Sequence, residues 1–408
     1  MNDNISVQNV AGYKVIYCYH PGPLVACRCI FNAGSCNETD PKDYGAAHYL
    51  EHMFFKGTEH KDWRQIDKEL DALGDYNAYT NYDKTGYYIN SLTEDFGKAF
   101  GLLTEMIFES RFDPVEFAKE NTVIQEEIQS YEDDPNGFFG SRVMESVWGP
   151  MGHWIAGKKD VVAAMTVDNL LRFKKNNYDK SNMVFVIVGG LEPKQQGEII
   201  TILAKYLDAM PEGTLRTWQS AKPQLENLEL EHTSTQAILT MTMQGLSSKE
   251  SMERNYVDDL FLNSLGQAAH SVLFSRIRQE LGLCYAISAY CDGYGGNNSI
   301  NIWTMIDAKN IDLVHDEILK EYRKVQQAGF EDEVLEISKK SMLYRICRNL
   351  TTPVGISGTL FEKYFIEGIF DPDKYKKGVL GLTNKDMMAF AEEMISGGVK
   401  LSVMNRSK

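Results

Sequence analysis

The second half of the chain repeats the pattern of the first half. The segment GAAHYLEHMFF (45–55) has a counterpart in GQAAHSVLFSRI (266–277), and RFDPVEFAKENTVIQEEI (111–128) has one in GFEDEVLEISKKSMLYRI (329–346). Such a repeat constrains the fold more than any local pattern, because both copies must form the same arrangement of helices and strands. We therefore expect two homologous α/β units of about 200 residues each.

Strand-like and helical segments alternate in each half. Segments typical of strands cover residues 13–19, 24–34, 85–92, 182–190, 237–245, 286–306 and 399–404. Segments with the apolar period of a helix cover residues 43–55, 63–73, 94–109, 114–132 and 166–177. A polar segment that contains proline separates the halves. The sequence thus predicts two domains and a linker, over residues 1–210, 229–408 and 211–228 respectively.

Bulk composition argues against several classes of partner. The net charge of −15 at pH 7 opposes binding to nucleic acids, whose phosphates require a basic surface, and gives no support to binding of anionic membranes. No apolar run approaches the roughly 20 residues of a membrane-spanning helix. The seven cysteines form no C-x-x-C pair, which indicates a reducing compartment. Because the start of the chain lacks the pattern of a signal or transit peptide, we expect a cytoplasmic protein.

The first repeat contains a candidate metal site. His48, Glu51 and His52 are spaced i, i+3 and i+4, which places them on one side of a helix within a single turn. Two imidazoles one turn apart can bind one Zn²⁺ ion, and a hydrolytic zinc site takes three protein ligands and a water molecule. Glu51 is then placed to take a proton from that water, as in the inverted H-x-x-E-H motif. The alternative is a pair of surface histidines beside a helical glutamate.

A third ligand is expected from an acidic residue on another helix. Glu120 and Glu127 are seven residues apart, which is two turns on one face of the segment 117–135. Glu126 points about 100° away from that face. We expect Glu127 to be the third ligand of one zinc ion per chain, and Glu120 to accept a hydrogen bond that orients a ligand histidine. The alternative is an ordinary charged helix face.

The second repeat keeps the first histidine and has lost the other three side chains. The positions that align with His48, Glu51, His52 and Glu127 are occupied by His270, Leu273, Phe274 and Arg345. Leucine and phenylalanine cannot bind a metal ion, and arginine repels one. The sequence therefore predicts a metal site in the first repeat only.

At four separate places the sequence resembles the pitrilysin family of zinc peptidases (peptidase family M16), and the resemblance covers nearly the whole chain. Residues 32–58 are similar to the inverted zinc signature of the family with both of its flanks, and residues 74–88 are similar to its substrate-edge segment. Residues 120–135 resemble the segment of the distal glutamate ligand, which falls on Glu127. Residues 274–289 resemble a motif that carries an arginine and a tyrosine seven residues apart.

The resemblance implies an α+β fold: two homologous α/β units, each a mostly antiparallel sheet with helices packed on one face. It also implies that units assemble around a closed chamber that admits short or unfolded peptides. Asn77 and Ala78 are candidates for binding a peptide as an added strand, with a plain turn as the alternative. Arg278 and Tyr285 are candidates for hydrogen bonds to the scissile carbonyl. Without the resemblance they would be interpreted as a surface arginine and a core tyrosine.

The resemblance also bears on assembly. In larger family members the arginine and the tyrosine lie in the last of four units, opposite the zinc-bearing first unit. This chain has two units, so Arg278 and Tyr285 are expected to complete the site of a partner chain. A homodimer suffices because each chain carries both half-sites, and a heterodimer with a zinc-free homologue is the alternative. Residues 147–160 depart from the usual family segment but keep His153 and Gly157, for which we expect a packing role.

The function expected from these features is that of a zinc-dependent endopeptidase acting on short or unfolded peptides inside a dimeric, clamshell-like chamber. One alternative is a structural or assembly subunit that keeps the fold without the activity, and the complete set of candidate zinc residues in the first repeat argues against it. The other alternative is a dedicated protease that matures one precursor peptide. It differs from general peptide turnover in its substrate and not in its chemistry.

Overall fold

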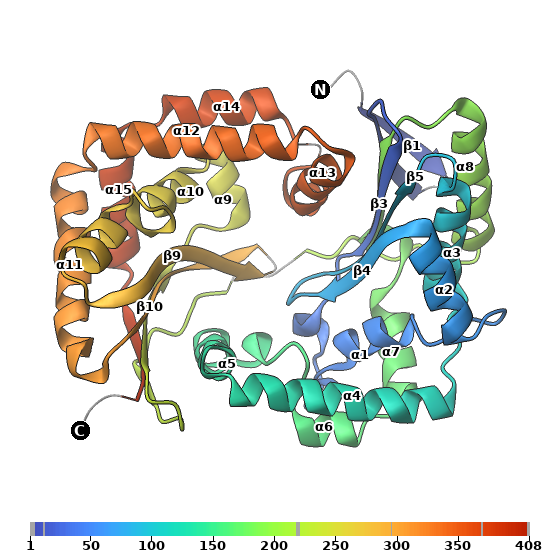
Figure 1. The fold of residues 1–408 in the computed structure, drawn as a ribbon, viewed down its shortest axis with the longest axis horizontal. Helices are drawn as coiled ribbons and strands as arrows, with labels where there is room; N and C mark the ends of the chain where they lie inside the picture. Colours follow the sequence, from blue (N-terminus) through green and yellow to red (C-terminus); the bar gives the residue numbers. More distant parts are fainter. Residues whose placement is uncertain (1–4, 11–12, 218–220, 295, 369, 406–408) are drawn as a thin grey trace. The chain divides into compact units, whose positions relative to one another are not determined.

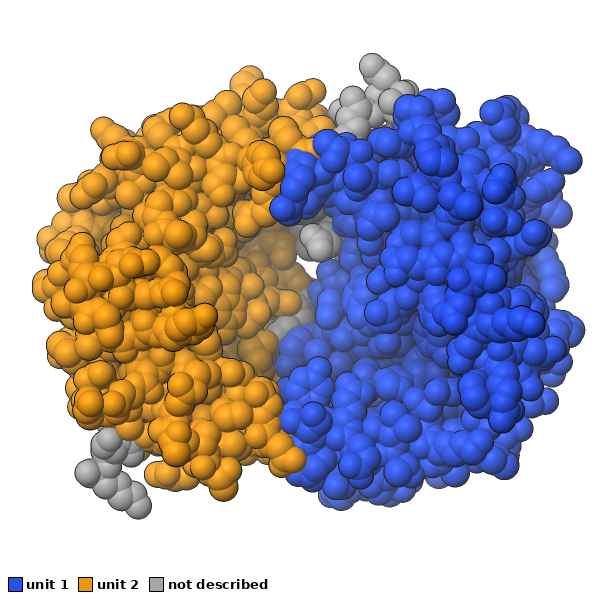
Figure 2. Space-filling view, viewed as in Figure 1, with its two compact units in different colours: residues 1–131, 153–217, 348–370 blue, residues 132–152, 218–347, 371–408 orange. Residues whose placement is uncertain are grey.

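The computed structural model describes residues 5–10, 13–217, 221–294, 296–368 and 370–405. The chain forms two compact units, which are coloured separately in Figure 2. Unit 1 comprises residues 1–131, 153–217 and 348–370, and unit 2 comprises residues 132–152, 218–347 and 371–408. No helix within the described ranges is long and apolar enough to cross a lipid bilayer.

The described part of unit 1 contains a six-stranded sheet in the order β1-β2-β6-β3-β5-β4 (Figure 1). Its strands are β1 (Ile5–Val10), β2 (Tyr13–Tyr19), β3 (Leu24–Phe31), β4 (Gly74–Thr80), β5 (Thr85–Leu92) and β6 (Met183–Gly189). Strands β2 and β6 run parallel, and the other neighbouring pairs are antiparallel. The expected mostly antiparallel sheet is therefore confirmed for unit 1.

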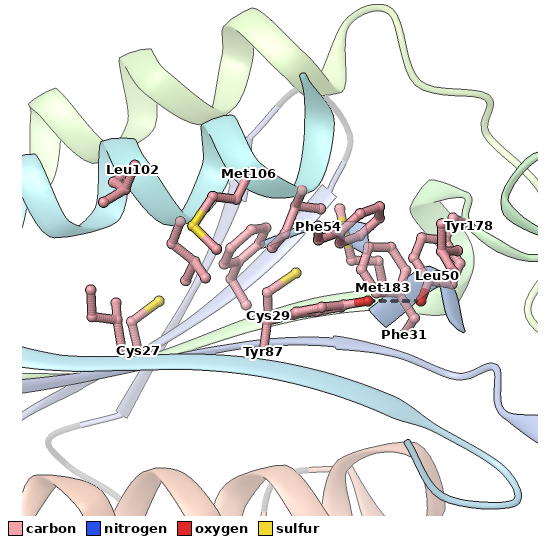
Figure 3. Packing of buried hydrophobic residues seen from close by; sticks show 14 of the residues in the cluster. Cys27, Cys29, Phe31, Leu50, Phe54, Tyr87, Leu102, Met106, Tyr178 and Met183 are labelled. Atoms are coloured by element: carbon pink, nitrogen blue, oxygen red, sulfur yellow. Dashed lines mark hydrogen bonds between the residues drawn. The ribbon is translucent and has the colours of Figure 1, made fainter. Parts of the chain in front are cut away.

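Helices of unit 1 pack on this sheet and form its main core. They are α1 (Ala46–Met53), α2 (Trp63–Leu73), α3 (Phe96–Phe108), α4 (Pro114–Asp133), α6 (Lys159–Ala163), α7 (Val167–Asn177), α8 (Pro193–Leu207) and α13 (Pro353–Glu367). All of them except α13 contribute to one buried apolar cluster with alternate residues of the strands. Figure 3 shows Cys27 and Cys29 of β3 projecting toward α3, the helix of Leu102 and Met106, whereas the Tyr87 hydroxyl of β5 meets that of Tyr178 (3.3 Å).

The opposite face of this sheet is apolar as well. Every residue of β6, Met183–Gly189, is buried, so this strand needs neighbours on both faces. Helix α13 contacts β3 and β6, and in Figure 1 it lies on the side of β3 away from α3 and α8. The Arg28 side chain of β3 donates a hydrogen bond to the Ser357 hydroxyl of α13 (3.1 Å). Helices thus cover both faces of this sheet, where the resemblance implied one.

The described part of unit 2 contains a five-stranded sheet in the order β7-β11-β8-β10-β9. Its strands are β7 (Leu228–Leu230), β8 (Ala237–Gln244), β9 (Cys284–Tyr294), β10 (Asn297–Ile306) and β11 (Lys400–Met404). Strand β7 runs parallel to β11, and the other pairs are antiparallel. The helices of unit 2 are α5 (Pro135–Trp148), α9 (Ser248–Glu253), α10 (Val257–Leu262), α11 (Ile311–Ala328), α12 (Asp332–Asn349), α14 (Pro372–Gly381) and α15 (Asn384–Ser396).

Two helices cross the domain boundaries predicted from the sequence. Helix α5 lies within the predicted domain 1–210 but belongs to unit 2, where it contacts β7. Helix α13 lies within the predicted domain 229–408 but belongs to unit 1. Each follows the long helix of its own repeat, α4 or α12. The place of α13 in unit 1 has a physical reason. This helix contacts β3 and β6 on the sheet face opposite the core cluster of the described residues.

Candidate metal centre

Helix α1 is short and is held at its first residues by a buried carboxylate. The chain enters it at Gly45 in a left-handed conformation (φ 98°), which glycine adopts without strain. The Glu38 carboxylate accepts hydrogen bonds from the backbone N–H groups of Gly45 (2.8 Å) and Ala47 (2.7 Å). A carboxylate at this end satisfies free N–H groups and is favoured by the helix dipole. His153 lies 2.7 Å from Glu38 and stacks on Tyr44, so it supports the start of α1.

The two sides of α1 differ in polarity. Its apolar side packs into the core of unit 1 through Ala46, Ala47, Tyr49, Leu50 and Met53. His48 and His52 lie on the other side, where 12% and 21% of their side-chain surfaces are exposed. The helix therefore buries an apolar stripe and leaves two imidazoles within reach of solvent.

Helix α4 places two glutamates beside these imidazoles. Ile124 is fully buried and anchors α4 in the core of unit 1. The Tyr49 hydroxyl of α1 donates a hydrogen bond to the backbone carbonyl of Phe117 (2.6 Å), which ties the two helices together. The Glu120 side chain is 6% exposed and the Glu127 side chain is 33% exposed. The seven-residue spacing thus brings one buried and one accessible carboxylate to the same helix face.

The structure brings His48, His52 and Glu127 together. Ligand atoms of the three side chains all lie within 4.8 Å of one another. The two Nε2 atoms are 3.2 Å apart, and each lies 3.7 Å from an oxygen of Glu127. Atoms that bind one zinc ion at about 2.0–2.1 Å in a tetrahedral arrangement are about 3.3 Å apart. The three separations are close to that value, whereas 3.7 Å is too long for a hydrogen bond.

The donor set also fits a divalent ion chemically. Burial lowers the pKa of His48 to about 3, so its imidazole is neutral at physiological pH, as a metal ligand must be. Among the described residues, the buried Nδ1 atom of His48 has no hydrogen-bond partner. Two imidazoles and a carboxylate form a donor set that zinc accepts. Within the described residues this is the one such cluster of histidine, cysteine and acidic side chains.

Glu120 contacts the His52 imidazole at Nδ1, the ring nitrogen that does not take part in the cluster. Its Oε1 lies 2.8 Å from Nδ1 of His52, and its Oε2 lies 2.7 Å from Nζ of Lys56. Burial acts to raise the pKa of Glu120, but the hydrogen bonds of His52 and Lys56 outweigh burial and lower it. When Nδ1 donates its proton to Glu120, Nε2 of the neutral ring keeps a free lone pair. The structure thus places Glu120 beside a candidate ligand histidine, and its role in orienting that histidine stays a prediction.

Glu51 is not one of the three clustered side chains, but it interacts electrostatically with two of them, His52 and Glu127. The residue is 9% exposed, and its Oε2 accepts a hydrogen bond from the Thr80 hydroxyl at the end of β4 (2.6 Å). Burial raises the pKa of Glu51 above its ordinary value, although the bond from Thr80 opposes the rise. A partly desolvated carboxylate held by one hydrogen bond suits a group that accepts and releases a proton.

Asn77 and Ala78 lie on β4, which is an edge strand of the sheet in unit 1. They pair with Tyr88 and Tyr87 of β5 on the inner side of the strand. The Asn77 side-chain oxygen accepts a hydrogen bond from the N–H group of Ala78 (2.8 Å). An extended peptide that added to this edge would take over that N–H group from the Asn77 side chain.

Arg278 and Tyr285 belong to unit 2, whereas the cluster of donors belongs to unit 1. Arg278 lies on a π-helical turn, residues 274–280, directly before β9. Its guanidinium carbon is 4.6 Å from the ring centroid of Phe274 and 5.2 Å from that of Tyr285. Tyr285 is 83% exposed. The two side chains therefore form a cation–π pair with the tyrosine facing solvent.

The equivalent position in unit 2 has become structural. His270 lies 3.0 Å from the Ser338 hydroxyl, and burial lowers the pKa of this histidine. Leu273 is fully buried. His270 therefore has a hydroxyl group as its hydrogen-bond partner and an apolar neighbour. The cluster of donors seen in unit 1 has no counterpart among these aligned residues.

Two residues that contact the site were not predicted from the sequence, namely Lys56 and Thr80. Lys56 follows His52 by four residues, and this helical spacing is a weak signal that both reach the same neighbour. Thr80 lies in the segment that was expected to bind substrate, but its bond to Glu51 joins residues 29 positions apart. No local pattern predicts that contact.

Comparisons with known proteins agree with this geometry. A family model described as "Insulinase (Peptidase family M16)" matches residues 14–151, and one described as "Peptidase M16 inactive domain" matches residues 164–342. An uncharacterized zinc protease of Rickettsia bellii is 26% identical over 423 residues, which cover 99% of this chain and 98% of that protein. The beta subunit of the mitochondrial-processing peptidase of Neurospora crassa is 24% identical over 383 residues, which cover 89% of this chain and 79% of that protein.

A solved structure agrees as well. The crystal structure of a peptidase M16 inactive domain from Pseudomonas fluorescens matches with a TM-score of 0.89 and 18% sequence identity, covering 99% of both chains. At this identity the likeness shows the fold. The first match contains His48, His52 and Glu127, and the inactive-domain match contains none of these candidate ligands. The chain belongs to peptidase family M16.

Proposed function

We propose that this chain is a zinc-dependent endopeptidase that hydrolyses short or unfolded peptides. The observation that carries the proposal is the cluster of His48, His52 and Glu127, in which the donor atoms have the spacing of zinc ligands and lie within reach of solvent. A buried carboxylate, Glu51, projects from the same helix. Two relatives of this chain are named zinc proteases, which supports zinc as the metal.

A small number of side chains would carry out hydrolysis of the peptide bond. A zinc ion held by His48, His52 and Glu127 would supply Lewis acidity to the scissile carbonyl and to the attacking water. Glu51 takes one proton from the water as the water oxygen bonds to the carbonyl carbon. It then gives that proton to the leaving nitrogen as the C–N bond breaks. The Thr80 hydroxyl holds Oε2 of Glu51 during both transfers.

The form of the substrate follows from strand β4. An edge strand binds an extended segment through backbone N–H and C=O groups, which every peptide possesses. Such binding requires the substrate backbone to be free of its own secondary structure. Asn77 and Ala78 would make these contacts at the exposed side of β4. We therefore propose broad specificity for peptides and no action on folded domains.

Hydrolysis of a mixed library of short peptides tests this proposal. The zinc-loaded chain is expected to cleave many members of the library and to leave a folded globular protein of similar composition intact. A chelator that removes zinc is expected to stop cleavage, and added zinc is expected to restore it. Mass spectrometry of the products provides the measurement. Cleavage that continues at full rate in the metal-free chain would contradict the proposal.

We further propose that the chain acts as a homodimer with two composite sites. The support is that one chain carries the cluster of donors in unit 1 and the pair Arg278 and Tyr285 in unit 2. Each partner would then supply Arg278 and Tyr285 to the site of the other, where they stabilise the developing oxyanion. A partner lacking the zinc helix would provide the same two side chains, so a heterodimer remains the competing assembly.

Mixing two inactive variants tests the composite site. Glu51→Gln chains keep Tyr285, and Tyr285→Phe chains keep Glu51. If sites form between chains, random mixed dimers contain one complete site, and about a quarter of wild-type activity returns. Hydrolysis of a fluorogenic peptide before and after mixing gives the comparison. No recovery in dimers shown to have exchanged would argue for a site formed within one chain.

A role as an assembly subunit without activity is the competing function. Such a subunit has no need of a complete donor set, whereas this chain keeps all three donors and Glu51 in place. A dedicated maturation protease would use the same site chemistry. The peptide-library experiment separates it from general turnover, because a dedicated enzyme would cleave few members of the library.

A further inference from the structure

Lys56 lies in the turn directly after α1. Its backbone N–H donates a hydrogen bond to the carbonyl of Met53, which continues the helical turn beyond the last residue of α1 (3.1 Å). Its side chain reaches α4, where Nζ lies 2.7 Å from Oε2 of Glu120. The other oxygen of the same carboxylate lies 2.8 Å from Nδ1 of His52. One carboxylate therefore links a candidate ligand imidazole to an ammonium group.

The carboxylate between them is the most buried of the three groups. The Glu120 side chain is 6% exposed, compared with 21% for His52 and 30% for Lys56. A charge-assisted hydrogen bond is stronger in such surroundings than in water, and two of them on opposite oxygens fix the plane of a carboxylate. With only one partner, Glu120 could rotate about its side-chain bonds and lose its alignment with the imidazole.

We propose that Lys56 is a positioning residue for the metal centre, acting through Glu120 to keep Nε2 of His52 aimed at His48 and Glu127. The inference rests on the zinc site of the proposed function. Within the described residues, no hydrogen bond or ion pair joins the Lys56 side chain to a candidate ligand, and its ion pair is with Glu120. Its effect is on the orientation of one ligand, and so its removal changes the affinity for zinc before it changes the fold.

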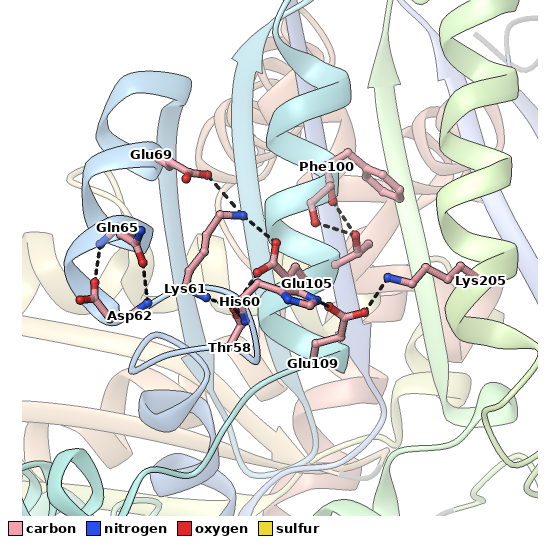
Figure 4. A network of polar contacts seen from close by, with 12 residues as sticks. Thr58, His60, Lys61, Asp62, Gln65, Glu69, Phe100, Glu105, Glu109 and Lys205 are labelled. Carbon is pink, nitrogen blue, oxygen red and sulfur yellow. Dashed lines mark hydrogen bonds and ion pairs between the residues drawn. The ribbon is translucent and has the colours of Figure 1, made fainter.

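The same loop offers a matched control. Lys61 lies five residues further on and forms the same kind of ion pair with a different carboxylate, with Nζ 2.7 Å from Glu105 and 3.5 Å from Glu69 (Figure 4). Glu105 belongs to α3, and within the described residues its carboxylate contacts Lys61 and Thr58 and no member of the cluster. Substitution of Lys61 removes one positive charge and two ion pairs from the loop without touching Glu120.

Zinc affinity, measured by competition with a chromophoric chelator, tests the inference. Lys56→Met is expected to weaken zinc binding about 10-fold or more, within the range found when a residue that supports a ligand is lost. Lys56→Arg, which keeps the charge and the hydrogen bond, and Lys61→Met are each expected to stay within about 3-fold of the wild type. Melting temperatures of the metal-free chains show whether each variant is folded.

A double variant tests whether the effect of Lys56 on zinc affinity depends on Glu120. If it does, Lys56→Met lowers zinc affinity in the wild-type chain but has little further effect in the Glu120→Gln chain. Equal losses in both backgrounds, or wild-type affinity of a folded Lys56→Met chain, would overturn the inference. The measurement uses zinc and no peptide. A chain that binds zinc in this pattern yet cleaves no peptide would refute the proposed function and leave the role of Lys56 standing.

Discussion

Replacing Glu51 with glutamine is expected to lower peptide hydrolysis by about 10²–10⁴-fold, the usual contribution of a positioned general base. Glutamine has nearly the same shape and still accepts the hydrogen bond of Thr80, but its amide cannot take a proton from water. The substitution leaves His48, His52 and Glu127 unchanged. The variant should therefore bind zinc with the stoichiometry of the wild type and lose activity alone.

The result is read from two measurements on the same preparation. Values of kcat/KM for a fluorogenic peptide report the chemistry, and zinc content reports the donor cluster. A variant that binds zinc and has lost hydrolysis supports Glu51 as the proton acceptor. Wild-type hydrolysis by a Glu51→Gln chain free of wild-type enzyme would show that another group takes the proton.

Much of the candidate site could be predicted because its spacing is local. His48 and His52 face one direction for the same reason that any residues four apart do on a helix. The predicted third donor followed from periodicity as well, and in the structure Glu127 joins the cluster while Glu126 is exposed. The helix expected over 63–73 has those bounds in the structure.

Two other contacts between distant segments could not be predicted in this way. The bonds of Thr80 to Glu51 and of Lys56 to Glu120 depend on how β4 and α4 pack beside α1. Packing of this kind is set by the whole core and leaves no periodic pattern in the sequence. Strand β4 was itself expected only in part, because an edge strand with exposed polar residues lacks the alternation of a half-buried strand.

The exchange of α5 and α13 between the units was also missed, although one signal was present. The run MVFVIVG of β6 is apolar throughout, whereas a strand covered on one face alternates between apolar and polar residues. Such a run implies that a second layer covers the sheet. It does not say which segment supplies the layer, and here the segment comes from the other repeat.

Replacing Glu127 with glutamine is expected to weaken zinc binding by more than about 100-fold, beyond the range for loss of a supporting residue. The amide lacks the charge that a carboxylate brings to a divalent ion. Glu127 has contacts to both imidazoles at 3.7 Å, which are too long for hydrogen bonds, so the fold loses little with the substitution. Peptide hydrolysis should fall with the loss of zinc.

Glu126→Gln is the matched control, because it removes the same charge from the adjacent, exposed position of α4. Zinc affinity of the two variants and the wild type, measured by chelator competition, tests the central claim that His48, His52 and Glu127 hold one ion. We expect one zinc per wild-type chain, an affinity for Glu126→Gln within about 3-fold of wild type, and a loss of more than about 100-fold for Glu127→Gln. Equal zinc affinity of the Glu126→Gln and Glu127→Gln chains would contradict this claim.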